Sequence, residues 1–244
     1  MKKINYSALC AALALCLSGC VFINFSDFNT VRGKGVPEKF EFKVGEYNRI
    51  TVDGYCEVRY YSASSDAVTL EIQPNLLEHY AIEVIGGELV VSNKKRLGLN
   101  TTVTPVLTVS TPVLTRLNID GAGVFLTYDK ITAESFDLIL GGAGRGRVEM
   151  DVKSLSVDMS GAGSFDLYGR ADTADLTMSG AGALNASLLQ TRETKVSFSG
   201  IGDLKIHCTE NLRIIADGLG SVEYSGSPRL DLSNSGLVSV KKIN

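Results

Sequence analysis

Residues 158–169 read DMSGAGSFDLYG, and residues 177–188 read TMSGAGALNASL. Both stretches place Ser-Gly-Ala-Gly between short runs in which apolar and polar residues alternate. Gly-x-Gly motifs recur along the chain, with first glycines at positions 121, 142, 161, 180, 200 and 218 and a last glycine at 236, where the second is lost. Successive motifs are 18 to 21 residues apart. Such a period is typical of a stacked-repeat protein.

Apolar residues occupy fixed columns around each motif. Four residues before the first glycine stand Leu117, Leu138, Val157, Leu176, Val196, Ile214 and Leu232. Four residues after it stand Phe125, Gly146, Phe165, Leu184, Leu204 and Val222. Alternation with period two indicates strands with one buried face. A unit this short buries that face only by stacking on its neighbours. We therefore expect an all-β fold, a right-handed parallel β-helix with rungs of about 18–21 residues.

The glycine motifs are interpreted as corners of this solenoid. Residues 141–146, GGAGRG, look like a phosphate loop. However, the Walker pattern needs a Gly-Lys-Ser/Thr ending, and a dinucleotide fingerprint needs a following helix. The sequence offers neither. We expect the glycines to face inward at tight corners that have no room for a side chain, or to occupy positions that need unusual backbone angles.

Residues 38–117 follow the repeat less regularly. Ile50 to Tyr60 fit the register of a first rung, with Cys56 in the place of the second glycine. Farther along, the sequence predicts a strand at 67–72, a helical turn at 74–80, a hairpin at 82–91 through Gly86-Gly87 and a strand at 106–109. We interpret 38–240 as one continuous solenoid domain, with regular rungs over 118–240.

The N-terminus has a different composition. Lys2 and Lys3 precede an apolar run at 8–17, which is too short to span a bilayer comfortably. Residues 17–20, LSGC, resemble a bacterial lipobox, in which the chain is cut before a cysteine that then carries lipid. This pattern predicts a signal peptide at 1–19, lipidation at Cys20 and a tether at 20–37. The alternative is an ordinary secretory signal that happens to contain a cysteine.

Charge and cysteine content limit the other functions. The net charge of −3 provides no basic surplus for nucleic acid. Cys56 and Cys208 are the cysteines of the mature domain, and either two buried free thiols or a disulfide fits them. The sequence has no CxxC motif or Cys/His cluster that would suggest a zinc site. We expect no metal site and no cofactor.

The outward columns predict a solvated face without catalytic residues. Arg147 with Asp166, and Lys205 with Glu223, are expected to form ion pairs between rungs. Tyr128, Tyr168 and His207 could touch a sugar ring. His79 and His207 have no serine or cysteine partner at a suggestive spacing. The alternative is a carbohydrate-active enzyme, a lyase or hydrolase whose carboxylates converge on one face.

Several segments together carry a family resemblance: 86–89 (GGEL), 106–109 (VLTV), 112–114 (PVL) and 117–123 (LNIDGAG). With the repeated Gly-x-Gly strands, they resemble the head GIN domain family of auto-transporter adhesins over about residues 38–240. The resemblance implies a β-helical envelope protein, often a lipoprotein, and it implies no reaction. We expect a non-enzymatic, lipid-anchored envelope protein with a binding, adhesion or structural role, at the outer membrane or the periplasmic face.

The middle residues of the corners suggest where a partner would bind. They are Ala122, Ala143, Ala162, Ala181, Ile201, Leu219 and Leu237. Their parity is opposite to that of the buried columns, so an unbroken strand would point them outward. We expect Ile201, Leu219 and Leu237 to form part of a surface that contacts an envelope protein, a glycan or a second copy of this chain. The alternative is that the corner turns them inward.

Overall fold

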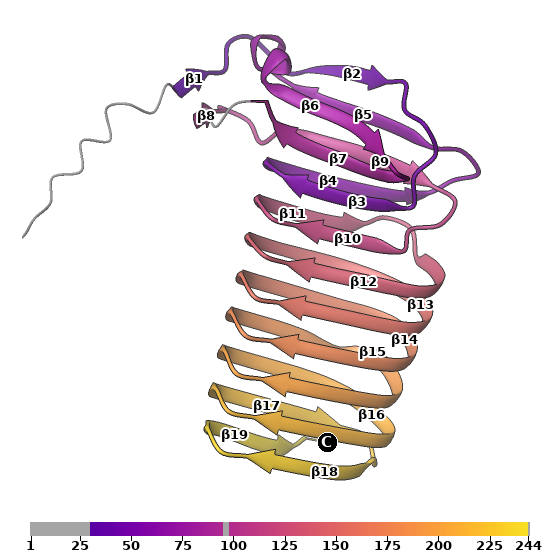
Figure 1. Ribbon diagram of the computed structural model, residues 1–244, viewed down its shortest axis with the longest axis vertical. Helices are drawn as coiled ribbons and strands as arrows, with labels where there is room; N and C mark the ends of the chain where they lie inside the picture. Colours follow the sequence, from indigo (N-terminus) through magenta and orange to yellow (C-terminus); the bar gives the residue numbers. More distant parts are fainter. Residues whose placement is uncertain (1–29, 95–97, 244) are drawn as a thin grey trace, which may run out of the picture.

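Each repeat of the sequence forms one coil of a β-solenoid (Figure 1). The structure is a computed structural model that describes residues 30–94 and 98–243. About 73% of the chain is strand and 3% is helix, and the parallel coils stack into about seven turns. The parallel β-helix expected from the repeats is therefore confirmed.

The regular coils begin at residue 116. Each has one strand before its Gly-x-Gly corner and one after it. Their strands are β10 (Arg116–Ile119), β11 (Ala122–Thr127), β12 (Ile131–Leu140), β13 (Ala143–Met159), β14 (Ala162–Met178), β15 (Ala181–Phe198), β16 (Ile201–Ala216), β17 (Leu219–Ser225), β18 (Arg229–Asn234) and β19 (Leu237–Lys242). The long strands β13 to β16 continue around a second, rounded corner, so each contributes to two successive coils.

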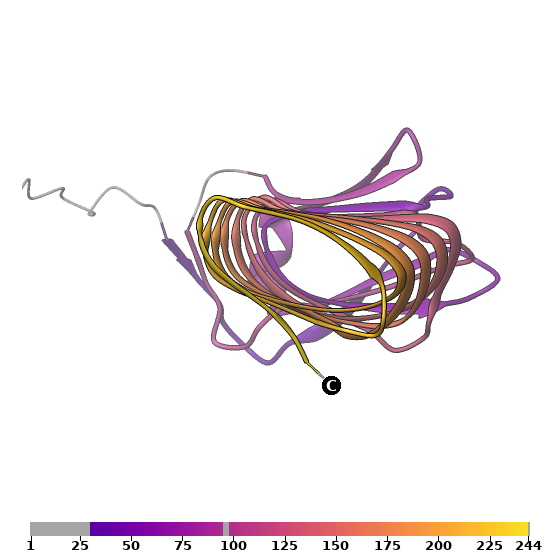
Figure 2. The same ribbon diagram turned by 90° about the horizontal axis from the view of Figure 1, so that it is seen from below.

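The core is one continuous column of inward-facing side chains along the solenoid axis. Seen from its C-terminal end, the molecule shows the coils superimposed on one another (Figure 2). Phe165, Leu184 and Leu204 line one side, and Val157, Leu176 and Ile214 line the other, each at most 2% exposed. The last coil differs, since Leu230 and Leu232 are 38% and 44% exposed. The expectation that the apolar columns are buried to their ends is therefore wrong for these two leucines, which no further coil covers within the described residues.

Chain order and spatial order differ at the N-terminal end. β3 (Arg49–Asp53) and β4 (Tyr55–Ser62) form a coil in parallel register with β10 and β11. β7 (Glu88–Asn93) and β9 (Val106–Thr111) form the next coil outward, parallel to β3 and β4. The β3–β4 coil thus lies between two coils that follow it in sequence. Cys56 pairs with Gly123, which confirms its place in the glycine column.

Antiparallel strands cover the N-terminal end of the core. β2 (Glu38–Phe42) pairs with β5 (Ala67–Ile72), β5 with β9, and β6 (Tyr80–Ile85) with β7. A 3-10 helix, η2 (Pro74–His79), joins β5 to β6, and β1 (Thr30–Arg32) pairs with β8 (Gly98–Asn100). The strand, helical turn and hairpin expected here are confirmed. β2, β5 and β6 do not continue the parallel coils and instead end the stack.

The corner glycines face backbone. A Cβ atom on Gly161 would lie 2.0 Å from the carbonyl oxygen of Gly142, and one on Gly163 would lie 1.8 Å from that of Gly144. Real Cβ atoms do not approach so closely, so any side chain would push adjacent coils apart. The expectation that the corner has no room for a side chain is confirmed. The expected inward direction is wrong for Gly161 and Gly163, because the missing side chain would point at the preceding coil. The alternative of unusual backbone angles is confirmed at Gly182, Gly202 and Gly220, where φ is 139° to 148°.

Candidate functional site

The Gly-x-Gly corner builds a ridge along the solenoid. In each coil the middle residue donates its backbone N–H to the carbonyl of the preceding corner: Leu219 to Gly200 at 2.9 Å and Leu237 to Gly218 at 3.0 Å. The parallel register places Ile201 beside Leu219, and Leu219 beside Leu237. Neighbouring strands are about 4.8 Å apart, so these side chains lie in a single file.

The large side chains of this ridge are exposed. Ile201 is 60% exposed, Leu219 45% and Leu237 80%. The alternative, that the corner turns them inward, is therefore wrong. We call Ile201, Leu219 and Leu237 the apolar ridge. The exposed alanines of the earlier corners continue its line toward the N-terminal end.

Sequence reasoning missed one member of this line. Tyr55 pairs with Ala122 and is 45% exposed, so an aromatic ring begins the file that Leu237 ends. The signal was present in the sequence, since Tyr55 stands between Gly54 and Cys56, where the other corners have alanine, isoleucine or leucine. The register that aligns Cys56 with the second glycines also places Tyr55 at the middle of its corner.

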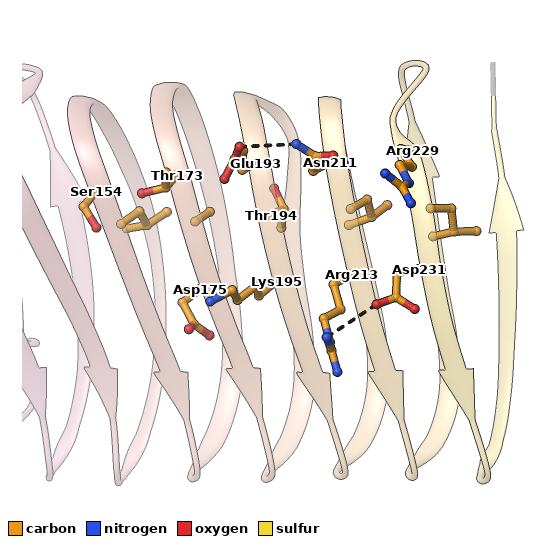
Figure 3. Close-up of a pocket in the computed structure, with 14 residues that line it drawn as sticks. Ser154, Thr173, Asp175, Glu193, Thr194, Lys195, Asn211, Arg213, Arg229 and Asp231 are labelled. Atoms are coloured by element: carbon orange, nitrogen blue, oxygen red, sulfur yellow. Dashed lines mark hydrogen bonds and ion pairs between the residues drawn. The ribbon is translucent and has the colours of Figure 1, made fainter.

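A polar groove of about 680 Å³ runs along the strands that follow the rounded corner. Figure 3 shows the polar side chains that line it on successive coils. One file is Ser154, Thr173, Glu193, Asn211 and Arg229, and a parallel file carries Asp175, Lys195, Arg213 and Asp231. The groove has hydroxyl, carboxylate, amide and cationic groups, and no aromatic side chain lines it.

Two of the carboxylates in this groove have partners from an adjacent coil. Glu193 accepts a hydrogen bond of 3.2 Å from the Asn211 amide, and Asp231 lies 3.5 Å from Arg213. Asp175 is in register with Lys195, and the two side chains lie close together in Figure 3. The negative groups of the groove therefore stand next to amide or cationic groups, an arrangement suited to structural support and polar binding.

The side chains expected to touch a sugar are engaged within the protein. Tyr128 stacks on Tyr61 with ring centroids 5.0 Å apart. The guanidinium of Arg147 lies 4.7 Å above the Tyr168 ring and donates to the Tyr168 hydroxyl at 3.3 Å. A neighbouring side chain covers one face of each ring, so at most the opposite face is open to a ligand.

One expected ion pair forms and the other does not. Lys205 lies 3.0 Å from Glu223, as predicted. Arg147 and Asp166 are in register, but Arg147 covers Tyr168, and Asp166 accepts a hydrogen bond of 3.0 Å from Asn185. The predicted Arg147–Asp166 ion pair is wrong because the flat guanidinium stacks on the aromatic ring instead.

His207 has a serine partner that sequence spacing did not suggest. Its Nδ1 lies 2.8 Å from the hydroxyl oxygen of Ser225, 18 residues away and one coil further along the solenoid. The expectation of no serine partner was therefore wrong. The signal lay in the repeat, because the two residues occupy one column of successive coils. Within the described residues no ion pair or hydrogen bond joins His207 to a carboxylate, which would be needed to orient the ring as in a catalytic triad.

The two cysteines of the domain are free and buried. The disulfide alternative is therefore wrong. Burial, reinforced by the nearby Glu57 carboxylate, raises the pKa of the Cys56 thiol from 9.0 to about 12. Cys208 donates to the carbonyls of Asn211 and Arg192 at 3.1 and 3.2 Å.

Three further observations concern the predicted sites. Cys20, the predicted lipidation site, lies outside the described residues. Among the residues that the structure describes, no three His, Cys, Asp or Glu side chains gather as metal ligands would. In the same residues, no helix has the length and apolar character that a membrane crossing requires.

Comparisons with known proteins agree with this architecture. The family model described as "Putative auto-transporter adhesin, head GIN domain" matches residues 46–228. No curated protein matches the chain. Solved structures do: a putative adhesin from Bacteroides fragilis aligns with a TM-score of 0.82 at 23% identity, over 87% of this chain and 100% of its own.

Two proteins from Parabacteroides distasonis align less closely. A putative lipid binding protein has a TM-score of 0.69 at 23% identity, and a putative adhesin has 0.67 at 21% identity. Both alignments cover 88% of this chain and 100% of the other. At such identities the structures demonstrate the shared fold alone. The family model covers most of the solenoid, from the first coil to the last corner but one, and the chain belongs to the head GIN domain family.

Proposed function

We propose that this chain is a non-enzymatic binding protein of the bacterial cell envelope, anchored by lipid at Cys20 and engaging a partner through the apolar ridge. The exposure of Ile201, Leu219 and Leu237 in consecutive coils is the observation that carries the proposal. A contiguous file of large apolar side chains on a solvent-exposed surface is typical of a contact site. Repeat proteins use such extended surfaces for binding.

The arrangement of the two ends supports an anchored role. β1, the first described strand, lies beside the antiparallel strands, and β18 and β19 lie at the opposite end of the stack (Figure 1). A tether that precedes residue 30 would therefore hold the N-terminal end near a membrane. The apolar ridge lies in the last coils, at the end opposite to this tether.

The anchor is tested by mass spectrometry of the mature N-terminus from native cells, combined with labelling by an alkyne-bearing fatty acid. The proposal predicts a chain that begins at a lipid-modified Cys20, and a Cys20→Ser variant that takes up no label. An unmodified Cys20, or cleavage at another residue, contradicts it.

A carbohydrate-active enzyme finds less support in the groove. Acid–base cleavage of a glycosidic bond needs two carboxyl groups that face one substrate bond. Glu193 and Asp231 instead bond to Asn211 and Arg213. Release of reducing sugar from envelope polysaccharide, abolished by Glu193→Gln, would favour the enzyme over the proposal.

A further inference from the structure

The last coil, formed by β18 and β19, has an open edge. All six residues of β18 are exposed. Leu230 and Leu232 hold positions that Leu212 and Ile214 fill one coil earlier at 1% exposure or less. Within residues 30–94 and 98–243, β18 pairs only with β16, and β19 only with β17.

The backbone of this coil offers a set of hydrogen-bonding groups at that edge. Ser235, Leu237 and Ile243 donate their N–H groups to the preceding coil at 2.8 to 3.0 Å. The polar groups of successive strand residues point to alternate sides, so those of the even-numbered residues of β18 and β19 point to the open edge. Such an edge is a template for another strand. The Asn234 side chain bonds one of these groups, the Val238 carbonyl, at 2.8 Å.

We propose that the last coil of a second copy of this chain covers this edge. The two copies would be related by a two-fold axis that runs along the strands of the coil and passes through the Gly236 corner. That operation stacks corner on corner and lays β18 of each copy antiparallel on β19 of the other. A two-fold contact of this kind needs a surface complementary to itself.

The sequence around Gly236 has that complementarity. Residues equally distant from Gly236 become partners across the interface. Four residues away, Leu232 meets Val240, and both belong to the set whose backbone groups point to the edge. Five residues away, Asp231 meets Lys241, and both point outward. The two-fold axis produces the Asp231–Lys241 pair twice. Both copies of the pair occupy a non-hydrogen-bonded position, where side chains of antiparallel strands approach most closely.

A different axis gives a poorer match. If the two-fold axis ran across the sheets through Leu232 and Val240, Asp231 would face Ser233, and Lys241 would face Ser239. Neither Asp231 nor Lys241 would then face a residue of opposite charge. Asp231 is already 3.5 Å from Arg213 of its own chain, but its side chain is 70% exposed and can accept a second cation.

This contact also has a consequence for the proposed function. The axis lies across the solenoid, so the N-terminal ends of the two copies point in opposite directions. If Cys20 is lipid-anchored, as proposed above, the contact joins copies anchored to two facing surfaces. The pairing of the last coils does not itself depend on the anchor.

Disulfide trapping tests the pairing in the full-length chain. Two differently tagged copies, one Asp231→Cys and one Lys241→Cys, are co-expressed and analysed by non-reducing electrophoresis. The buried Cys56 and Cys208 do not compete, and Cys10, Cys16 and Cys20 are replaced by serine in every variant. We expect a crosslinked species that contains both tags, and none when either variant is expressed alone. Arg213→Cys with Glu223→Cys, in the same columns one coil earlier, is the matched control and should not crosslink.

Self-crosslinking of Asp231→Cys alone, or no mixed crosslink, overturns the proposal. A charge exchange supplies a second test, by sedimentation of the full-length chain in detergent. Asp231→Lys or Lys241→Asp should each weaken self-association about tenfold, since each dimer contains two such pairs, and the double exchange should restore it. Equal association in all four proteins also overturns it. Neither outcome bears on Cys20, whose lipidation is measured separately.

Discussion

Leu219 and Leu237 are partners in the parallel register of β17 and β19, and both side chains are exposed. The strands are joined at this point by the Leu237 N–H, which donates to the Gly218 carbonyl at 3.0 Å. The backbone ladder therefore fixes the spacing of the two leucines, so that binding a partner costs little backbone entropy. A preorganised apolar file of this kind is the surface through which we expect this protein to engage its partner.

Leu219→Asp should weaken partner binding or self-association without unfolding the domain. The substitution places a charge in the middle of the apolar ridge, while the exposed side chain contributes little to the core. Co-purification from native cells and thermal unfolding measure the two effects. Leu188→Asp is the matched control, because Leu188 is 65% exposed and lies away from the ridge. Unchanged association with an intact fold would remove the ridge from the account.

Gly161→Ala should lower the free energy of unfolding by about 2 kcal/mol or more, because the added Cβ would collide with the Gly142 carbonyl. Gly45→Ala is the control, since a Cβ there meets nothing within 4 Å. Urea denaturation of both variants measures the difference. Equal stability of the two variants, with loss of a bound phosphate ligand in Gly161→Ala only, would revive the phosphate-loop interpretation.

Much of the solenoid could be predicted because each coil repeats the same constraints. The glycine column and the alternating strands fix the register, so Cys56 could be aligned with Gly123 across a gap of 67 residues. The antiparallel strands could not be predicted in the same way. The alternation in β2 and β5 indicates a strand with one buried face, and it does not name the neighbour. The β3–β4 coil also breaks the rule that neighbours in sequence are neighbours in space.

The features of the site that could be predicted are those set by the alternation of side chains along a strand. The exposure of Ile201, Leu219 and Leu237 follows from strand parity. The partner of Arg147 does not, since Asp166 and Tyr168 are both within reach on the next coil and the choice depends on side-chain packing. The exposed Leu232 also escaped prediction, because a column of apolar residues carries no sign of where the stack ends.

The protein should lose stability at alkaline pH through Cys56. Burial holds the folded-state pKa of this thiol at about 12, against 9.0 ordinarily. The unfolded chain therefore releases the proton first as the pH rises. The stabilisation is complete below pH 9 and is lost toward pH 12, by up to about 1.4 kcal/mol per pH unit.

Urea denaturation between pH 8 and 11 measures this loss. Cys56→Ala should be less stable at pH 8 because of the lost packing, and its stability should fall less steeply above pH 9. The buried hydroxyls of Tyr47 and Tyr80, whose pKa values burial also raises, add to the loss in both proteins. Parallel curves for the wild type and the variant would show that Cys56 does not titrate as inferred.

The proposed binding role depends most directly on whether the apolar ridge touches a partner in the envelope. A photo-crosslinking amino acid placed at Leu219 in native cells measures this, with the same group at Lys153, which is 68% exposed at the rounded corner, as control. We predict a discrete adduct of fixed mass from Leu219 that is absent from Lys153. No adduct at Leu219, or the same products from both positions, would contradict the account.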